Sequence, residues 1–318
     1  MVTVRPVIEG IEARKALRKT LASLEPQVAS DLWERAVWVA LFLCAAFAVI
    51  MALAVAISLL VPTVAFFGTI SPWDFFTGTI WSPDIGGYYG VLPLVIGTLI
   101  IAGGACAIGL PLGLGAAIYL REYAPARVRE IVKPALEILA GIPTVVLGFF
   151  AILVVSPILQ DWFGASFFSG ANAIVVIGVL IIPLVSSLSE DALTAVPKDL
   201  RDGALALGAT PLEATGRVIL PAALSGIGAS FVLAFGRAVG ETMVVLIAAG
   251  QQTFIEFNIF EQMTTMAGFI AKRATGDLPA GTTLTNSMFA VGLTLFGITL
   301  MLNIVGDRLR ARFREKYE

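Results

Sequence analysis

Two charged residues interrupt an apolar stretch in the second half of the chain. Arg237 and Glu241 lie within an apolar run from about Leu220 to Ala249. Residues four apart share one face of a helix, so we expect the two side chains to be neighbours. A charge at the centre of a bilayer costs at least ~2.5 kcal/mol, and such charges normally face a bundle interior or a wet cavity. The pattern therefore predicts a functional pair, and a structural ion pair that locks two helices together is the alternative.

The chemistry that this pair could do is the transient binding of an oxyanion. The guanidinium of Arg237 is a permanently charged, planar donor that can hold two oxygens of one anion. Glu241 would be its counter-charge, holding Arg237 when no anion is present and keeping the anion weakly bound, as a transport pathway requires. The hydroxyl groups of Thr242 and Thr144 could donate to the same anion, or bond instead to carbonyls of their own helices. We predict a translocation pathway that contains Arg237, Glu241, Thr242 and Thr144.

The composition places these residues in a membrane protein. Of 318 residues, 58% are apolar and only 14% are charged, which is typical of a chain with several membrane spans. The chain has no histidine, and both cysteines, Cys44 and Cys106, lie in apolar runs. We therefore expect the cysteines to be packing residues and expect no metal site. No Gly-x-x-x-x-Gly-Lys-Ser/Thr motif occurs, so we expect any ATP–Mg²⁺ to be bound by a partner subunit.

Uncharged windows predict six membrane-spanning helices at ~20 residues per span. The first window is ended by Pro62, and the third contains Pro143. Proline inside a span breaks the backbone ladder, and we expect a kink at Pro143 that either lines the pathway or serves packing. Glycines at 103, 104, 109, 113 and 115 predict close helix approach in the second window. The six windows are Ala36–Val61, Leu92–Leu120, Ile138–Gln160, Ala171–Ser189, Leu220–Ala249 and Leu284–Val305.

The distribution of basic residues predicts that both termini are cytoplasmic. Of the 21 Lys and Arg, all but Arg237, Lys272 and Arg273 lie in the two tails or in the connections of the same parity. The connections 62–90 and 251–283 would then be extracytoplasmic. Aromatic residues in the first of these would anchor at the interface or meet an extracytoplasmic partner, and they are Trp73, Trp81, Tyr88 and Tyr89.

The polar segment 190–221 predicts two short helices on the cytoplasmic side. The first would begin after Pro197 and end at Gly208, because glycine readily adopts the positive φ that ends a helix. The second would be capped by Thr210, with Pro211 at its first position and Glu213 in its first turn. Such an arrangement on a membrane protein is typical of a docking element, and an ordinary amphipathic loop is the alternative.

The same segment resembles the EAA loop of binding-protein-dependent ABC importer permeases. That loop reads E-A-A, three residues, G, nine residues and I-x-L-P, and its spacing fits here without a gap. Three positions depart from it: Asp202 replaces Glu, Gly203 replaces Ala and Val218 replaces Ile. Gly203 weakens helix propensity by ~1 kcal/mol against Ala. The resemblance implies docking on an ATPase subunit through Asp202, Gly203, Ala204, Gly208, Leu220 and Pro221.

Three further stretches are similar to the phosphate-specific transport permeases. Gly236–Met243 resembles the G-R-A-L-G-E-T-M stretch of that family, and Ala140–Gly148 resembles its I-P-S-I-V-x-G stretch. Trp81, followed by Tyr89–Leu99, resembles the approach to the family's second span. The methionine after Glu-Thr and the Tyr-Gly-x-x-Pro approach favour the PstC group over the paralogous PstA group. The resemblance runs from about residue 80 to 250.

The resemblance implies an all-α, polytopic, type I (MetI-like) permease fold in the inner or plasma membrane. The chain would be no enzyme but half of the pathway of an ATP-driven phosphate importer. Implied partners are a second permease subunit (PstA-like), an ATPase dimer (PstB-like), an extracytoplasmic phosphate-binding protein (PstS-like) and membrane lipid, with no nucleic acid. The expected divisions are a tail 1–34 that is either an interfacial helix or disordered, a first helix 35–61, a permease core 92–306 with coupling loop 190–221, and a basic tail 307–318.

Three alternatives are open. The nearest is a permease of the same superfamily for another oxyanion or a different solute, since the docking segment alone would be compatible with it. An intramembrane enzyme would need clustered catalytic groups, and the chain has no histidine and only Arg237 and Glu241 as charges within its spans. A structural membrane protein is the third alternative, and the intramembrane charges disfavour it.

Overall fold

The computed structural model describes residues 31–276 and 281–312. In this part of the chain, six helical segments are long and apolar enough to cross a membrane: Arg35–Phe67, Leu92–Tyr123, Thr144–Phe163, Gly170–Thr194, Pro211–Val239 and Thr283–Arg308. The prediction of an all-α chain with six spans is confirmed. The expectations for residues 1–30 of the N-terminal tail and for the end of the basic tail lie outside the described residues.

The chain divides into two units within the first long helix, α2 (Asp31–Phe67). The first unit ends at Ser58, and its described side chains beyond Glu34 are nearly all exposed and apolar. A helix that is apolar on every side suits a lipid environment. The helix runs through Pro62 to Phe67, so the prediction that Pro62 ends it is wrong. A proline removes one backbone donor, which membrane helices tolerate, and the following Phe66 is buried in a core.

The second unit begins with a small aromatic core around a two-stranded sheet. Helix α3 (Pro72–Thr77) precedes strands β1 (Trp81–Ser82) and β2 (Tyr88–Tyr89), which pair antiparallel with Trp81 opposite Tyr89. Trp81 is 1% exposed and packs edge-on against Phe269 of α13 (Met266–Ala274). The predicted anchoring role is therefore wrong for Trp81, because its indole fills this core. Trp73 and Tyr88 are exposed, and for them the anchoring role stays a prediction.

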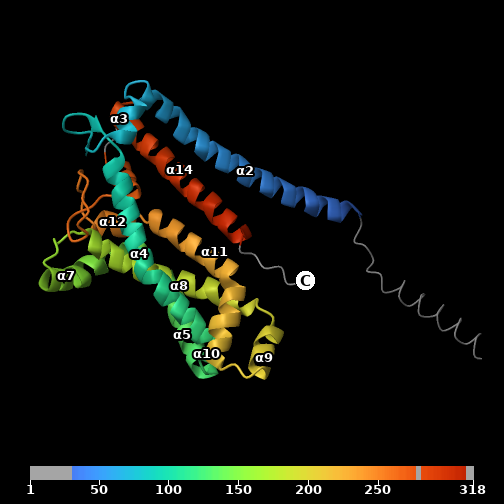
Figure 1. Cartoon of the computed structure of the whole chain (residues 1–318). Coiled ribbons are helices and arrows are strands. Elements are labelled where there is room, and N and C mark those ends of the chain that lie inside the picture. Colours follow the sequence, from blue (N-terminus) through green and yellow to red (C-terminus); the bar gives the residue numbers. More distant parts are fainter. Residues whose placement is uncertain (1–30, 277–280, 313–318) are drawn as a thin grey trace, which may run out of the picture. The chain divides into compact units, whose positions relative to one another are not determined.

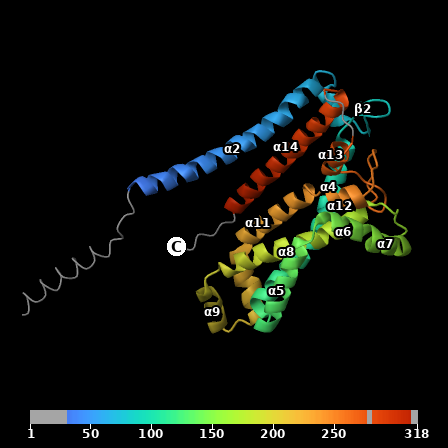
Figure 2. The ribbon, with the colours of Figure 1, turned by 180° about the vertical axis from the view of Figure 1, so that it is seen from behind.

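Helices α4 (Leu92–Ile118) and α8 (Gly170–Thr194) form the central pair of the second unit. Their close approach depends on glycine: a Cβ on Gly109 would lie 2.5 Å from the carbonyl oxygen of Gly178. Gly104 and Gly113 likewise face α8 side chains, whereas Gly103 and Gly115 have open space around them. Close packing is thus confirmed for three of the five predicted glycines. Helix α11 (Leu220–Val239) packs against both α4 and α8, as Figures 1 and 2 show.

The third span begins later than predicted. Helix α5 (Ala126–Gly141) continues past Ile138, and Pro143 precedes a new helix, α6 (Thr144–Phe150). A π-helical segment, η2 (Ala151–Val155), and α7 (Ser156–Phe163) complete the span. The prediction of one span from Ile138 with a kink at Pro143 is wrong. Proline disfavours the helical conformation at the preceding residue, and Ile142 is extended at φ −67° and ψ 127°.

The predicted short helices of segment 190–221 are confirmed. Helix α9 (Lys198–Ala206) begins directly after Pro197, and Gly208 has a φ of 89°. Thr210 and Glu213 form a capping box at the start of α10 (Pro211–Ala214). From α10 the chain continues through π-helical η3 (Thr215–Ile219) into α11 without a break.

The fifth span ends earlier than predicted. Helix α11 ends at Val239, and a separate short helix, α12 (Met243–Ala248), follows. The Thr242 hydroxyl donates to the carbonyl of Gly240 at 3.0 Å, a local bond that competes with helix continuation. The prediction of a single helix to Ala249 is therefore wrong. The last helix, α14 (Thr283–Arg312), follows α13.

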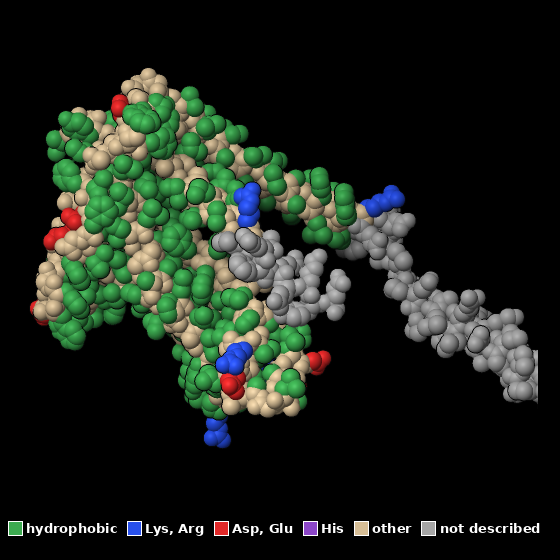
Figure 3. Space-filling model, viewed as in Figure 1, with side chains coloured by type: hydrophobic (Ala, Val, Ile, Leu, Met, Phe, Trp, Pro, Cys, Tyr) green, Lys and Arg blue, Asp and Glu red, His purple; other side chains and the backbone are tan. Residues whose placement is uncertain are grey.

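The surface of the described chain is mainly hydrophobic. Figure 3 shows hydrophobic side chains over most of the visible face, with Lys, Arg, Asp and Glu side chains visible at the lower end, where α9 and α10 lie in Figure 1. Figure 3 also shows acidic side chains at the left edge and at the top, so charges elsewhere on this face are few and scattered. A mainly apolar surface is expected of helices that cross a bilayer. The π-helical segment η1 (Tyr119–Tyr123) follows α4 directly. It contacts α9 through an ion pair that is described below.

Candidate functional site

A cavity of about 290 Å³ lies among η1, α5, α8 and α11. Four charged side chains reach it, two positive and two negative: Lys133, Arg237, Glu137 and Glu190. The remaining lining residues are mostly apolar, with two serines: Leu120, Leu136, Ala140, Leu180, Pro183, Leu184, Ser186 and Ser187. We call it the Arg237 cavity. The cavity thus lies where the spanning helices α8 and α11 meet α5, which is not among the six spans. Charges within a span, such as Arg237, normally face an interior of this kind.

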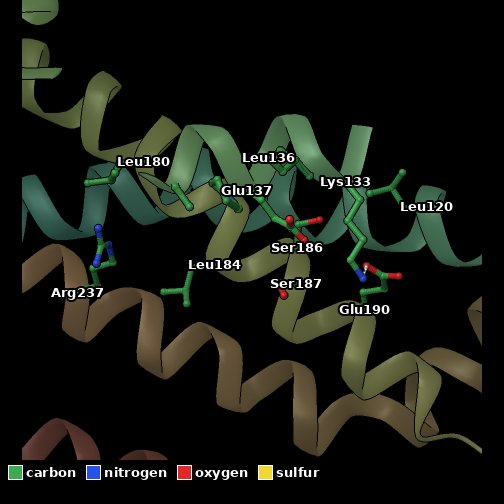
Figure 4. Close-up of a pocket in the computed structure, with 12 residues that line it drawn as sticks. Leu120, Lys133, Leu136, Glu137, Leu180, Leu184, Ser186, Ser187, Glu190 and Arg237 are labelled. Atoms are coloured by element: carbon green, nitrogen blue, oxygen red, sulfur yellow. Dashed lines mark ion pairs between the residues drawn. The ribbon is translucent and has the colours of Figure 1, made fainter. Parts of the chain in front are cut away.

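Arg237 enters the cavity from the last turn of α11. Figure 4 shows its guanidinium at one end of the cavity and the Lys133–Glu190 ion pair at the other. The helix macrodipole favours a cation in a last turn. Arg237 is exposed. Among the described residues, it forms no ion pair and no side-chain hydrogen bond. All of its donors are thus available to a ligand.

Glu241 does not pair with Arg237 in this structure. Its side chain is buried, and its Oε1 accepts a hydrogen bond from the backbone N–H of Val244 at 3.3 Å. The carboxylate therefore caps the first turn of α12, where the helix macrodipole favours a negative charge. The prediction that the two side chains share one helix face is wrong, because α11 ends between them. The break places the cation at the end of one helix and the anion at the start of the next.

The two predicted threonines lie outside the Arg237 cavity. Thr242 uses its hydroxyl on the Gly240 carbonyl, as described above. Thr144 is the first residue of α6 and half-buried. Helices α6 and α12 pack together, with Gly148 against Ile247. The structure thus brings the two segments near each other but places neither threonine among the residues that line the cavity with Arg237.

The structure adds a buried carboxylate that the sequence reasoning missed. Glu190 on α8 is 3% exposed and forms ion pairs with Arg129 and with Lys133, whose Nζ lies 3.3 Å from Oε2. A buried charge needs such partners, because desolvation is costly. Its signal was present: Glu190 follows a predicted span directly, and Arg129, Lys133 and Glu137 recur every four residues on one helix face.

The predicted docking segment projects from the unit. Helix α9 has no buried residue, and Leu207 beside it is 91% exposed. Arg201 of α9 forms an ion pair with Glu122 of η1, with Nη1 and Oε2 2.9 Å apart. Exposed apolar side chains on a tethered helix are typical of a surface that contacts another protein. Of the predicted docking residues, Asp202, Gly203 and Ala204 lie in α9, Gly208 follows it, and Leu220 and Pro221 begin α11.

Comparison with known proteins assigns the chain to a family. Residues 109–315 match the family model described as "Binding-protein-dependent transport system inner membrane component". The chain belongs to this family. The match covers the cavity-lining helices α5, α8 and α11, as well as α9 with its docking residues.

Relatives of this family resemble the chain over most of its length. "Probable ABC transporter permease protein YqgH" of Bacillus subtilis is 32% identical over 76% of this chain and 79% of its own. "Phosphate transport system permease protein PstC" of Mesorhizobium japonicum is 33% identical over 72% of this chain and 76% of its own. An inward-facing structure of the MetNI methionine ABC transporter superposes with a TM-score of 0.57, at 20% identity, over 70% of this chain and 97% of that one.

These findings confirm the predicted class of protein. The chain is a multi-pass membrane protein with the MetI-like permease fold, and its relatives are transporter permeases and not enzymes. The family description also names the kind of system, one that depends on a binding protein. The orientation of the termini and the roles of the single site residues stay predictions.

Proposed function

We propose that this chain is the transmembrane permease subunit of an ATP-driven importer of inorganic phosphate and forms half of its translocation pathway. The observation that carries the proposal is Arg237, whose guanidinium has no ion-pair partner in the described part of the chain and lines a cavity between α5 and the spanning helices α8 and α11. A planar, permanently charged donor suits a tetrahedral oxyanion, because it can bind two of the oxygens at once. The PstC name of the Mesorhizobium japonicum relative supports phosphate as the anion.

The charges of the Arg237 cavity suit transit better than storage. Lys133 and Arg237 attract a phosphate, while Glu137 and Glu190 on the same cavity repel it. Lys133 is already paired with Glu190, so of the two cations only Arg237 has no partner among the described residues and can meet the anion. Weak, reversible binding is what a transported ion needs in order to leave. Glu241, Thr242 and Thr144 are proposed to line other parts of the pathway near the α11–α12 break.

Helix continuity would couple this site to ATP hydrolysis. The helical segment Pro211–Val239 has 29 residues, which is about 43 Å at ~1.5 Å per residue. It begins beside α9 and ends at Val239, with Arg237 in its last turn, so a displacement of α9 can be transmitted to the cation along one continuous helical segment. In this proposal α9 docks on a PstB-like ATPase dimer, which binds the ATP–Mg²⁺, and both termini are cytoplasmic.

The other proposed partners follow from the same orientation. A PstA-like permease would provide the second half of the pathway, and lipid would surround the apolar faces of the spans. A PstS-like binding protein would deliver phosphate on the side opposite α9, where the aromatic core around Trp81 lies. This orientation also gives the basic tails and α9 the same side, as the positive-inside rule requires.

Uptake of radiolabelled phosphate by cells that contain only variant copies of this chain tests the proposal. Arg237→Ala at wild-type abundance should abolish uptake, and Arg237→Lys should retain only part of it, because lysine keeps the charge but loses the fork of donors. Arg127→Ala is the matched control: it removes one exposed arginine of α5 that forms no ion pair among the described residues. Wild-type uptake with Arg237→Ala would refute the role of Arg237.

A second candidate is an importer of another oxyanion, since the name of the YqgH relative gives no solute. An unpaired arginine would bind sulfate or molybdate through the same donors. Competition decides between the two: excess sulfate or molybdate should leave phosphate uptake unchanged. Strong inhibition by either anion would favour the second candidate.

A further inference from the structure

A second cavity, of about 200 Å³, lies beside the aromatic core, and we call it the Trp81 cavity. Its lining comes from β1 and the turn after it, from α12, and from α13 with the loop that precedes it. Lys272 and Arg273 both line it. They are the two basic residues that depart from the charge asymmetry of the sequence, since the predicted extracytoplasmic connections hold no other Lys or Arg. The two basic residues of the predicted extracytoplasmic connections therefore line the same cavity.

Three polar atoms of the lining residues are buried without a hydrogen-bond partner in the described residues. They are Trp81 Nε1, Thr264 Oγ1 and Arg273 Nε. Buried polar groups are almost always hydrogen-bonded, so three orphaned ones at one cavity need an explanation. Trp81 Nε1 and Arg273 Nε can only donate, and the threonine hydroxyl can donate as well. A ligand that satisfies them must be an acceptor.

The guanidinium of Arg273 has two neighbours that hold it in place, the ring of Phe269 and the carboxylate of Asp84. The guanidinium of Arg273 lies 5.6 Å from the ring centroid of Phe269, and that ring lies 4.9 Å from Trp81 in an edge-on contact. Arg273 also forms an ion pair with Asp84, whose side chain is 53% exposed. The face of the Phe269 ring attracts the guanidinium and helps to hold it in place. The exposed carboxylate is a counter-ion that an incoming anion can replace.

The remaining groups near the cavity do not oppose an anion. Lys272 donates to the side-chain carbonyl of Gln251, which leaves its positive charge uncompensated. Burial, and next Asp84, raise the pKa of Tyr89, while Arg273 lowers it, so the net rise keeps the phenol neutral near neutral pH. Asp84 is thus the one carboxylate among the lining residues, against two cations.

We propose that the Trp81 cavity is an anion-binding site that receives phosphate on the extracytoplasmic side before it reaches Arg237. The inference rests on the proposed function for its solute and its orientation. The cavity volume of about 200 Å³ is several times the ~30 Å³ that one water molecule occupies in the liquid, so a hydrated oxyanion has room in it. Val245 and Leu246 of α12 line this cavity, and Arg237 at the end of α11 lines the other. In the chain, the α11–α12 break at 240–242 therefore separates the residues that line the two sites.

Direct binding of inorganic phosphate tests the proposal. The sample is the whole transporter in nanodiscs without its binding protein, in an Arg237→Ala background, measured by equilibrium dialysis with radiolabelled phosphate. Phosphate should still bind in this background. Arg273→Gln should weaken its affinity at least tenfold, equivalent to ~1.4 kcal/mol. Trp81→Phe should weaken it about fivefold through the loss of one hydrogen bond. Arg127→Gln, which removes an equal charge outside both cavities, should change nothing.

Asp84→Asn protects the test against a folding artefact. It removes the competing counter-ion and should tighten phosphate binding, a gain that a misfolded chain cannot produce. Unchanged or weaker binding in Asp84→Asn, or equal affinity in Arg273→Gln, would overturn the proposal.

Two further results are informative in the same system. If Arg273→Gln lowers association of the phosphate-binding protein and leaves phosphate affinity intact, the cations serve protein docking and the proposal is wrong. Phosphate uptake by the unmodified transporter is measured in parallel. Normal uptake with no binding at the Trp81 cavity rejects this inference alone, whereas absent phosphate uptake rejects the proposed function as well.

Discussion

Replacing Gly109 by alanine tests whether the α4–α8 contact supports the Arg237 cavity. An added Cβ would lie 2.3 Å from Ile181 Cγ1 and 2.5 Å from the Gly178 carbonyl oxygen. Ordinary contacts of this kind are near ~3.5 Å, so the helices must separate by about 1 Å. Both obstacles lie on α8, and one is backbone that cannot turn away. We therefore expect the variant to unfold more easily than the wild type.

The magnitude follows from two opposing effects. Overpacking in a close-packed interior costs about 1–3 kcal/mol, and alanine in place of glycine in a helix contributes about 1 kcal/mol of stability. Gly115→Ala is the matched control, because it lies on the same helix with nothing within 4 Å of the added Cβ. Gly109→Ala should thus be about 1–3 kcal/mol less stable than Gly115→Ala, with the propensity term cancelling between them.

Unfolding of the purified chain in mixed micelles, with increasing SDS and with helicity as the signal, measures this difference. Phosphate uptake should fall with Gly109→Ala as well, since α8 carries Ser186, Ser187 and Glu190 on the cavity wall. Equal stability of the two variants would show that α4 and α8 are not in close contact at Gly109. The reasoning about the helix pair would then be wrong.

Three further predictions concern the docking segment and the α11–α12 break. Gly208→Ala places a side chain at φ 89°, which costs about 1–2 kcal/mol, and it should reduce co-purification with the ATPase. Gly203→Ala is the control, because it has open space in α9 and should leave co-purification unchanged. Equal loss in both variants would contradict the prediction. Glu241→Ala removes the acceptor for the Val244 N–H and should cost about 1 kcal/mol in thermal unfolding, with Glu241→Gln less affected; an unchanged melting temperature in the alanine variant would exclude the capping role. We expect Glu122→Arg and Arg201→Glu each to impair phosphate uptake, and the double exchange to restore it, because it re-forms the ion pair. Wild-type uptake in both single variants would show that the ion pair does not contribute to coupling.

Much of the fold could be predicted because its determinants are local. Long uncharged windows indicated six spans, and the structure has six. Pro197, Gly208 and the Thr210–Glu213 pair marked the ends of α9 and α10 through backbone conformation and capping, which depend on neighbours in the sequence. The errors in span boundaries arose at prolines and at residue 240, where a hydropathy window does not register a break in the backbone.

Of the site, the central cation was predictable, but most of the other lining residues and the geometry were not. The sequence singled out Arg237, since a charge within an apolar run is visible without a fold. It also suggested that Glu241 is its neighbour, because a four-residue spacing implies one helix face only when the helix continues. The structure ends α11 at Val239 and turns Glu241 into the cap of α12. Continuity of a helix is decided by packing and capping on both sides of the break, which no local spacing contains.

Long-range contacts belong to the tertiary structure alone. The sequence by itself determined the class of protein, the number of spans, the short helices of segment 190–221 and the cation within a span. Only the fold placed Glu190 between Arg129 and Lys133, from helices about 60 residues apart in the chain, as its ion pair with Arg129 records. Only the fold gathered Trp81, Thr264 and Arg273 around one cavity. These groups meet because α5 packs on α8 and because α13 packs on the core around β1. That arrangement depends on side-chain volumes across all the helices at once.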